Sequence, residues 1–156
     1  MNECWKFFRY AQISDAKKVT NIFKNNKWLS KHKHAYIQSK IKKNECIYES
    51  SVVINFTLIK KKIHIGNISI NPNNTLLDQI IRENLSLKNT YAQHVFTKFL
   101  NCTIGNTYLI VDVNNYRAIN FYKKVKMVKI DEYLSKDENK KKLIFVYYKN
   151  YNMDLN

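Results

Sequence analysis

The chain has very few of the residues that usually turn or interrupt a polypeptide. Its 156 residues include two glycines, Gly66 and Gly105, and one proline, Pro72. Asn, Asp and Ser must therefore make most of the turns, because their short polar side chains suit turn conformations. There is no internal repeat and no low-complexity linker. We therefore predict a single domain over residues 1–156.

Long apolar runs are also missing. The longest apolar segments are interrupted by Lys, Asn or Asp, so no segment is predicted to cross a bilayer. The first ten residues lack the apolar stretch and the cleavage site of a signal peptide. We therefore expect a cytoplasmic protein with no membrane partner. The hydrophobic fraction of 45% is that of a folded chain rather than a disordered one.

Acidic residues are scarce. The chain has 12 Asp and Glu against 27 Lys and Arg, which gives a formal net charge of +15. Such an excess favours a polyanionic partner such as DNA or tRNA. The alternative is that AT-rich codons supply many of these lysines, since Asn and Ile are also abundant. Charge alone reports non-specific attraction, so nucleic acid is a candidate partner and no more.

The cysteines and histidines show no metal-binding pattern. Cys4, Cys46 and Cys102 are far apart in the chain, without the paired spacing of a metal site. His32 and His34 lie two residues apart among lysines, which favours a solvated face. We therefore predict no metal site.

Hydrophobic periodicity indicates a chain that mixes helices and strands. Ser14 is expected to cap the first helix with its hydroxyl. Runs of strands come early, and helices alternate with strands later, which is typical of an α+β fold, a mixed α/β sandwich. Strands are predicted at 7–13, 46–49, 52–59, 64–70, 75–82, 108–113, 129–134 and 143–148, and helices at 16–23, 33–43, 91–102 and 117–126.

Residues 108–127 carry the most specific pattern in the chain. A buried strand is followed by Asn-x-x-Ala-x-x-Phe-Tyr at 115–122 on a predicted helix. This block resembles one in the GNAT superfamily of acyl-coenzyme-A-dependent N-acyltransferases. The family usually has Gly-Phe where this chain has Lys126-Met127. The resemblance implies a GNAT-like fold, with a central, mostly antiparallel sheet and helices on both faces.

The resemblance also implies catalytic roles for Tyr122 and Asn115. Tyr122 matches a family tyrosine that can protonate the departing thiolate, and a phenol with a pKa of about 10 suits this role. Asn115 is expected to cap its helix and to contact the coenzyme. The alternative for Tyr122 is a core aromatic residue with a satisfied hydroxyl.

Acetyl-CoA is the implied acyl donor. In the family, its pyrophosphate binds the main chain of a glycine-containing loop at the start of a helix. The matching stretch here contains no glycine, which leaves two outcomes open. Either coenzyme binding is retained through the main chain, or the fold serves only to bind another partner. The coenzyme contacts that the resemblance implies are Leu87, Lys88, Asn89, Thr90, Tyr91, Ala92 and Asn115.

The implied function is transfer of an acetyl or related acyl group from acyl-CoA to an amine. The acceptor stays open among a small amine, a protein amine, aminoacyl-tRNA and a nucleobase. Asp78, Glu83 and Asp112 are candidates for the base that deprotonates the amine, and each could equally be a surface charge. Two alternatives remain: a phage Mom-like DNA base-modifying enzyme, and a non-catalytic nucleic-acid-binding module on a GNAT scaffold.

A nucleic-acid acceptor would require basic contacts near the acceptor. In GNAT folds the early helical region borders the acceptor side, so its lysines and those of a following turn are candidates. The lysines at 140–142 are expected to lie on a remote hairpin turn. The candidate contacts are Lys31, Lys33, Lys40, Lys42, Lys43, Lys60, Lys61 and Lys62.

Overall fold

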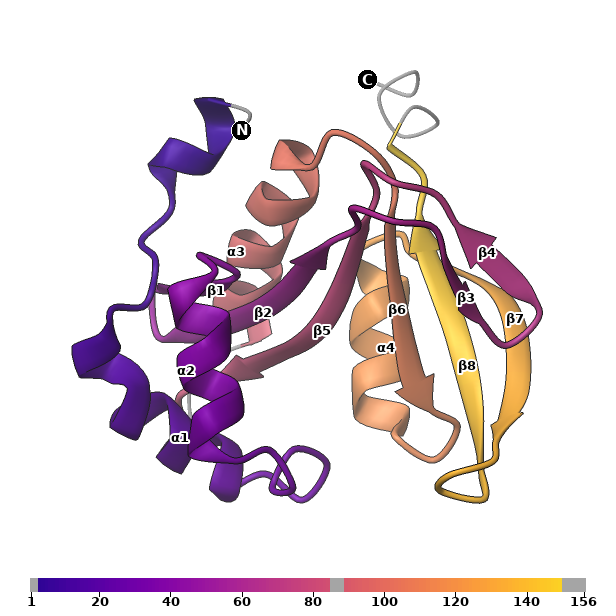
Figure 1. Cartoon of the computed structure of the whole chain (residues 1–156), viewed down its shortest axis with the longest axis horizontal. Helices are drawn as coiled ribbons and strands as arrows, with labels where there is room; N and C mark the ends of the chain where they lie inside the picture. Colours follow the sequence, from indigo (N-terminus) through magenta and orange to yellow (C-terminus); the bar gives the residue numbers. More distant parts are fainter. Residues whose placement is uncertain (1–2, 85–88, 150–156) are drawn as a thin grey trace. The chain divides into compact units, whose positions relative to one another are not determined.

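The computed structural model describes residues 3–84 and 89–149, which form two compact units (Figure 1). The first unit consists of Met1–Thr57 and Asp78–Phe96, and the second of Leu58–Leu77 and Thr97–Asn156. Strand β5 and helix α3 each contribute residues to both units. The expectation of a single domain stays a prediction.

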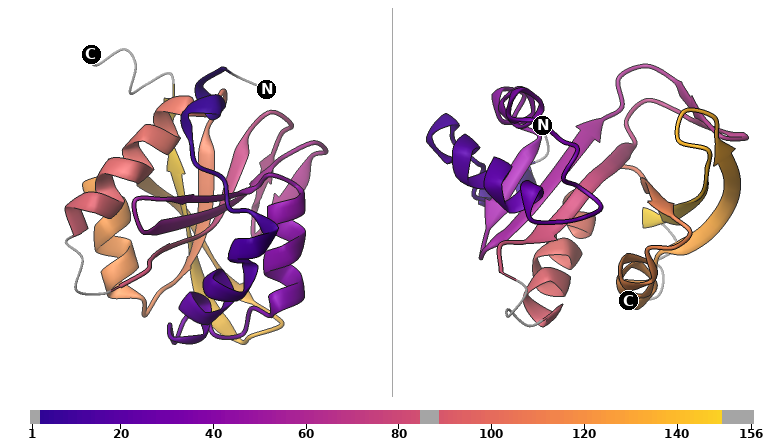
Figure 2. Two further views of the ribbon diagram at one scale, coloured as in Figure 1. Left: turned by 90° about the vertical axis from the view of Figure 1, so that its left-hand side faces the viewer. Right: turned by 90° about the horizontal axis from the view of Figure 1, so that it is seen from below.

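The first unit packs helices against a small group of strands. Strands β1 and β2 pair antiparallel, with Cys46 opposite Asn55. Helices α1 and α2 cover one face of these strands, and the first part of α3 covers the other (Figures 1 and 2). Its elements are η1 (Glu3–Phe7), η2 (Ile13–Asp15), α1 (Ala16–Lys24), α2 (His34–Lys42), β1 (Cys46–Glu49), β2 (Val52–Leu58), the later part of β5 (Thr75–Arg82) and the first part of α3 (Asn89–Cys102).

The core of the first unit follows from the amphipathic pattern of its helices. Val19, Ile22 and Phe23 of α1 are buried at helical spacing. They share one hydrophobic cluster with Ile37 of α2 and Cys46 of β1. Cys46 is a free cysteine, and burial raises the pKa of its thiol to about 12. This thiol is therefore protonated and unreactive at neutral pH.

The segment at 7–13 does not form the predicted strand, so that prediction is wrong. It connects η1 to η2, and Tyr10 makes a single β-bridge with Ile47. The buried side chains in this segment are Phe8 and Ala11. They are three residues apart, a spacing that does not fit the alternation of a strand.

Two further local predictions are wrong. Ser14 lies inside η2, and the residue that precedes α1 is Asp15. The single strand expected at 64–70 is instead a hairpin of β3 (Ile63–Ile65) and β4 (Ile68–Ile70). Gly66, with φ of 56°, makes the turn between them, because glycine adopts positive φ without a steric cost.

The second unit is built on the strand order β5-β6-β8-β7. Strand β6 pairs parallel with Thr75–Leu77 of β5 and antiparallel with β8. The predicted C-terminal hairpin is confirmed, since β7 pairs antiparallel with β8. Besides β3, β4 and the start of β5, its elements are the end of α3, β6 (Thr107–Asp112), α4 (Tyr116–Lys124), β7 (Val128–Ser135) and β8 (Lys140–Tyr147).

Both glycines lie where a side chain would not fit. A Cβ at Gly105 would be 2.5 Å from Asn74 Oδ1 and 2.6 Å from the carbonyl oxygen of Asn73. A Cβ at Gly66 would be 2.9 Å from a ring carbon of Tyr133. The two glycines of this chain are therefore required by close packing, and one of them also by its φ angle.

The fold class is the predicted one. Helices and strands are mixed along the chain, and the described strand pairs are antiparallel except β5 with β6. This is an α+β architecture with a mostly antiparallel sheet.

Candidate functional site

The turn from β6 into α4 is built by two polar side chains. Asp112 ends β6, and its Oδ1 accepts a hydrogen bond of 2.8 Å from the Asn114 N–H. Asn115 then caps α4, because its Oδ1 accepts from the Ala118 N–H at 3.4 Å. The predicted helix cap is therefore confirmed. A contact between Asn115 and a coenzyme stays a prediction.

Tyr122 lies on the inner side of α4. It is 8% exposed, and its ring centroid lies 6.3 Å from that of Phe145 on β8. Burial raises the pKa of the Tyr122 phenol well above its ordinary value. The hydroxyl therefore keeps its proton across the physiological pH range. A buried, protonated phenol suits either a proton donor or a core residue.

The start of α3 is the other predicted site. Leu87 and Lys88 lie outside the described residues, and so does the side chain of Asn89. Thr90 is exposed, Tyr91 is 54% exposed, and Ala92 is buried. Main-chain N–H groups in the first turn of a helix have no partner within that helix. A helix begins at the predicted position, and anion binding at its first turn stays a prediction.

A hollow of about 290 Å³ lies beside this first turn. Ser50 comes from the turn between β1 and β2, and the other lining residues belong to α3. The wall combines three hydroxyl-bearing side chains, those of Ser50, Thr90 and Tyr91, with an imidazole and apolar surface. Its lining residues are Ser50, Thr90, Tyr91, His94 and Val95.

Each carboxylate proposed as a base is bound to lysine. Asp78 Oδ2 lies 2.7 Å from the Lys40 ammonium, and Asp112 Oδ2 lies 3.9 Å from that of Lys142. Glu83 Oε1 lies 2.9 Å from the ammonium of Lys18. The hydrogen bond from Lys18 lowers the pKa of Glu83. A carboxylate held by a cation is a weaker base than a free one.

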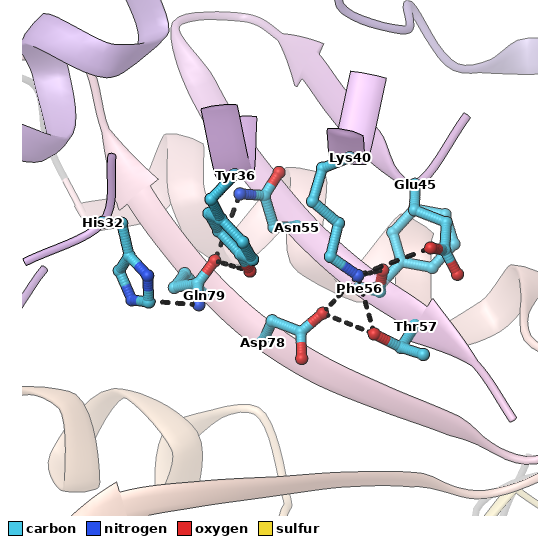
Figure 3. A network of polar contacts seen from close by, with 9 residues as sticks. All are labelled: His32, Tyr36, Lys40, Glu45, Asn55, Phe56, Thr57, Asp78 and Gln79. Atoms are coloured by element: carbon cyan, nitrogen blue, oxygen red, sulfur yellow. Dashed lines mark hydrogen bonds and ion pairs between the residues drawn. The ribbon is translucent and has the colours of Figure 1, made fainter. Parts of the chain in front are cut away.

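Lys40 is buried, so its prediction as a nucleic-acid contact is wrong. It is 7% exposed, and its ammonium donates to Thr57 Oγ1 at 2.7 Å and to the Phe56 carbonyl at 2.6 Å. It also pairs with Asp78 and Glu45 (Figure 3). The buried ammonium therefore has oxygen partners for its N–H donors, as a buried polar group requires.

Gln79 is the hub of a second group of contacts beside this lysine. Its Oε1 accepts from the Tyr36 hydroxyl at 3.0 Å and from Asn55 Nδ2 at 3.1 Å. Its Nε2 lies 3.4 Å from His32 Nε2 (Figure 3). Because the amide oxygen already accepts twice, the amide nitrogen is the donor to His32.

His32 does not lie on a solvated face, contrary to expectation. Its ring stacks on Tyr36, with centroids 4.8 Å apart, and meets the edge of Phe23 at 6.0 Å. Burial, together with the charge of Lys31, lowers the pKa of His32. The imidazole is therefore neutral at physiological pH.

Asn55 supplies one polar atom that the described residues leave unpaired. The side chain is fully buried, and its Oδ1 has no hydrogen-bond partner among them.

The sequence carries a signal for the polar contacts around Lys40 and Gln79. Asp78 and Gln79 form a polar pair inside the otherwise apolar run Leu76–Ile81. Such a pair in the middle of a strand needs polar partners on neighbouring elements.

Among residues 3–84 and 89–149, no group of three or more His, Cys, Asp or Glu side chains could hold a metal ion. In the same residues, no helix is long and apolar enough to cross a membrane.

Comparison with known proteins places the fold among GNAT acetyltransferases. No protein-family model matches the sequence, and no curated protein matches it. Solved structures do match. A GNAT-family acetyltransferase from Bacillus cereus has a TM-score of 0.69 at 17% identity, over 90% of this chain and 94% of that one.

Two further structures extend the match. An aminoglycoside N(6')-acetyltransferase from Legionella pneumophila has a TM-score of 0.68 at 12% identity, covering 96% of this chain and 95% of that one. Arabidopsis thaliana NAA60 in complex with acetyl-CoA has a TM-score of 0.66 at 15% identity, covering 92% and 98%. At such low identities the likeness shows a shared fold.

Proposed function

We propose that this protein is an acyl-CoA-dependent N-acyltransferase that transfers an acetyl group from acetyl-CoA to an amine. The observation that carries the proposal is the β6–α4 segment. Asn115 caps the helix and Tyr122 lies buried and protonated one turn beyond Ala118, on a fold shared with GNAT acetyltransferases. One of those structures contains acetyl-CoA.

The first turn of α3 fits the anionic part of acetyl-CoA. Its main-chain N–H groups and the positive end of the helix dipole attract phosphate without any glycine. Thr90 adds a hydroxyl at this turn. We assign Leu87, Lys88, Asn89, Thr90, Tyr91 and Ala92 to coenzyme binding, with Asn115 as a further contact.

Acetyl-CoA supplies an acyl carbon that is bonded to a good leaving group, sulfur. The amine attacks this carbon, the carbon–sulfur bond breaks, and sulfur leaves with the bonding electrons. Tyr122 donates its phenolic proton to that sulfur. The proton lost by the amine returns to the phenolate through solvent, because Asp78, Glu83 and Asp112 are all bound to lysines.

Calorimetric titration with acetyl-CoA tests the proposal. We expect saturable binding that Thr90→Glu weakens, because a carboxylate in the first turn repels phosphate while suiting the helix dipole. Thr97→Glu makes the same chemical change at an exposed position further along α3 and should leave the affinity unchanged. If the wild-type protein takes up no acetyl-CoA, the coenzyme-dependent function is wrong.

For the acceptor, we propose an amine on nucleic acid or on a molecule associated with it. The support is the net charge of +15. Transfer of labelled acetyl groups can be compared among tRNA charged with an amino acid, a lysine-containing peptide and spermidine. If a DNA base is modified without consumption of acetyl-CoA, the Mom-like alternative is favoured. Nucleic-acid binding without any transfer favours the non-catalytic module.

A further inference from the structure

Helix α4 and the turn after it carry exposed cations without acidic neighbours. Helix α4 contains no Asp or Glu. By contrast, Lys141 and Lys142 of the C-terminal hairpin pair with Glu132 and Glu138. The cations in question form no ion pair within the part of the chain that the structure describes. We name them the α4 basic face: Arg117, Lys123, Lys124 and Lys126.

The helix geometry spreads these charges along one side. At about 1.5 Å of rise per residue, Arg117 and Lys124 lie roughly 10 Å apart along the axis. Asn120 is exposed between them. Tyr116, at the start of the helix, is 69% exposed. Ile119 and Tyr122, on the other side of α4, are buried.

Lys126 occupies a position that does not suit a lysine. Its φ is 68°, and it follows the helix end, where the Met127 N–H returns to the Tyr122 carbonyl at 3.0 Å. Glycine is preferred at this point because a Cβ is unfavourable at positive φ. The other described non-glycine residues with positive φ are all Asn or Ser: Asn44, Ser50, Ser51, Asn73 and Asn139.

The lysine at 126 therefore costs conformational energy, and what it adds is a cation beside Lys123 and Lys124. Strain at an exposed residue points to a role outside folding. The lysines of the last helical turn also interact favourably with the helix dipole. Lys126 lies beyond the helix end in a left-handed conformation. Stabilisation by the helix dipole therefore does not explain why position 126 holds a lysine instead of a glycine.

We propose that the α4 basic face binds the phosphate backbone of nucleic acid. Four cations along a short path match a strand whose charges recur every few ångströms. The exposed Tyr116 ring, next to Arg117, offers a surface on which a base can stack. A membrane-binding helix would need several apolar residues on the same side, whereas Tyr116 is the one large hydrophobic side chain of α4 that is exposed. The inference stands independently of acyl transfer.

The test is the affinity for a fluorescent single-stranded oligonucleotide over a series of salt concentrations. The triple variant Lys123→Gln/Lys124→Gln/Lys126→Gln should bind at least about tenfold more weakly. Each phosphate contact contributes roughly 0.7 to the slope of log affinity against log salt. The loss of three contacts should therefore make this slope shallower by about 2. The matched control replaces Lys136, Lys140 and Lys141, which are exposed on the C-terminal hairpin of the same unit, and should change little.

Lys126→Gly separates binding from folding. It should weaken oligonucleotide binding and yet raise the unfolding midpoint by about 2–4 °C, because it relieves the strained φ angle. A merely structural lysine would not combine these two effects. Equal losses of affinity in the hairpin control and in the α4 variant would overturn the proposal in favour of diffuse charge.

Two other measurements can overturn it. If the α4 substitutions weaken acetyl-CoA binding by as large a factor as they weaken oligonucleotide binding, the basic face serves the coenzyme phosphates. Vesicles of phosphatidylcholine with phosphatidylserine test a lipid surface. Binding to these vesicles in place of the oligonucleotide would assign the face to membranes. Unchanged acetyl-CoA affinity with weakened oligonucleotide binding supports the proposal.

Discussion

The Lys40 ammonium lies 2.7 Å from the carboxylate of Asp78, and both side chains are largely buried. The pair joins α2 to β5, while Thr57 of β2 accepts from the lysine and donates to the aspartate. Two residues that could have served as a nucleic-acid contact and a catalytic base instead neutralise each other. Their main role in this structure is to fix α2 on the strands.

Lys40→Met should be strongly destabilising. The substitution leaves the carboxylates of Asp78 and Glu45 buried without their cation, which costs about 3–5 kcal/mol of unfolding free energy. Urea unfolding followed by circular dichroism measures this loss. Lys42→Met, at an exposed position of the same helix, should stay within about 0.5 kcal/mol of the wild type.

The double variant Lys40→Met/Asp78→Leu tests the cause. Removing Asp78 together with Lys40 leaves only the Glu45 carboxylate without its cation, so part of the stability lost in Lys40→Met should return. If the single variant is as stable as Lys42→Met, the ion pair does not hold α2 in place.

The buried pair also shows what the sequence could not predict. Lys40 belongs to a lysine-rich segment, and its partner Asp78 is 38 positions later, so no local pattern indicates its burial. The same holds for His32, whose partner Gln79 comes from β5. Charged and polar residues are usually exposed, and only tertiary contacts reverse that expectation.

Local patterns predicted the rest of the chain well where they were strong. The continuous apolar strand β6, the amphipathic α3 and the Asn115 cap of α4 are all present. The prediction of a strand at 7–13 was wrong because the apolar residues of this segment are buried from an irregular connection between two short 3-10 helices. The candidate coenzyme site rests on resemblance, since the first turn of α3 contains no diagnostic side chain.

Stability should depend on pH through His32. Burial lowers the pKa of this imidazole below its ordinary value of 6.5, so the folded protein takes up the proton less readily than the unfolded chain. The unfolding free energy should therefore decrease as the pH falls through about 6.5, and level off below the folded pKa. Asp78 opposes this shift, and Lys31 adds to it.

His32→Gln should flatten the stability curve between about pH 7.5 and pH 5. The control His64→Gln replaces an exposed histidine on β3 and should retain the wild-type slope. Thermal midpoints measured in a single buffer series are sufficient. A wild-type slope in His32→Gln would show that another group takes up the proton.

Gly105→Ala should be destabilising because there is no room for the new methyl group. It would lie 2.6 Å from the carbonyl oxygen of Asn73 and 2.5 Å from Asn74 Oδ1, which accepts from the Asn106 N–H. The main chain must then shift, at a cost of about 1–3 kcal/mol. Chemical unfolding measures this, with Asn71→Ala, at an exposed nearby position, as the control.

Tyr122→Phe separates the chemical role of this residue from its role in the core. Phenylalanine preserves the ring that packs against Phe145, so acetyl-CoA affinity and stability should change little. If the phenol supplies the proton that the leaving sulfur needs, turnover at saturating substrate should fall about 100-fold. Tyr116→Phe removes a hydroxyl from an exposed residue of the same helix and should leave turnover unchanged.

Asn115 gives the complementary test. Asn115→Asp keeps an oxygen for the Ala118 N–H, whereas Asn115→Ala loses the cap and about 1 kcal/mol of stability. If both Asn115 variants bind acetyl-CoA normally while Tyr122→Phe keeps full turnover, α4 has no part in catalysis. In that case Tyr122 is a residue of the core alone.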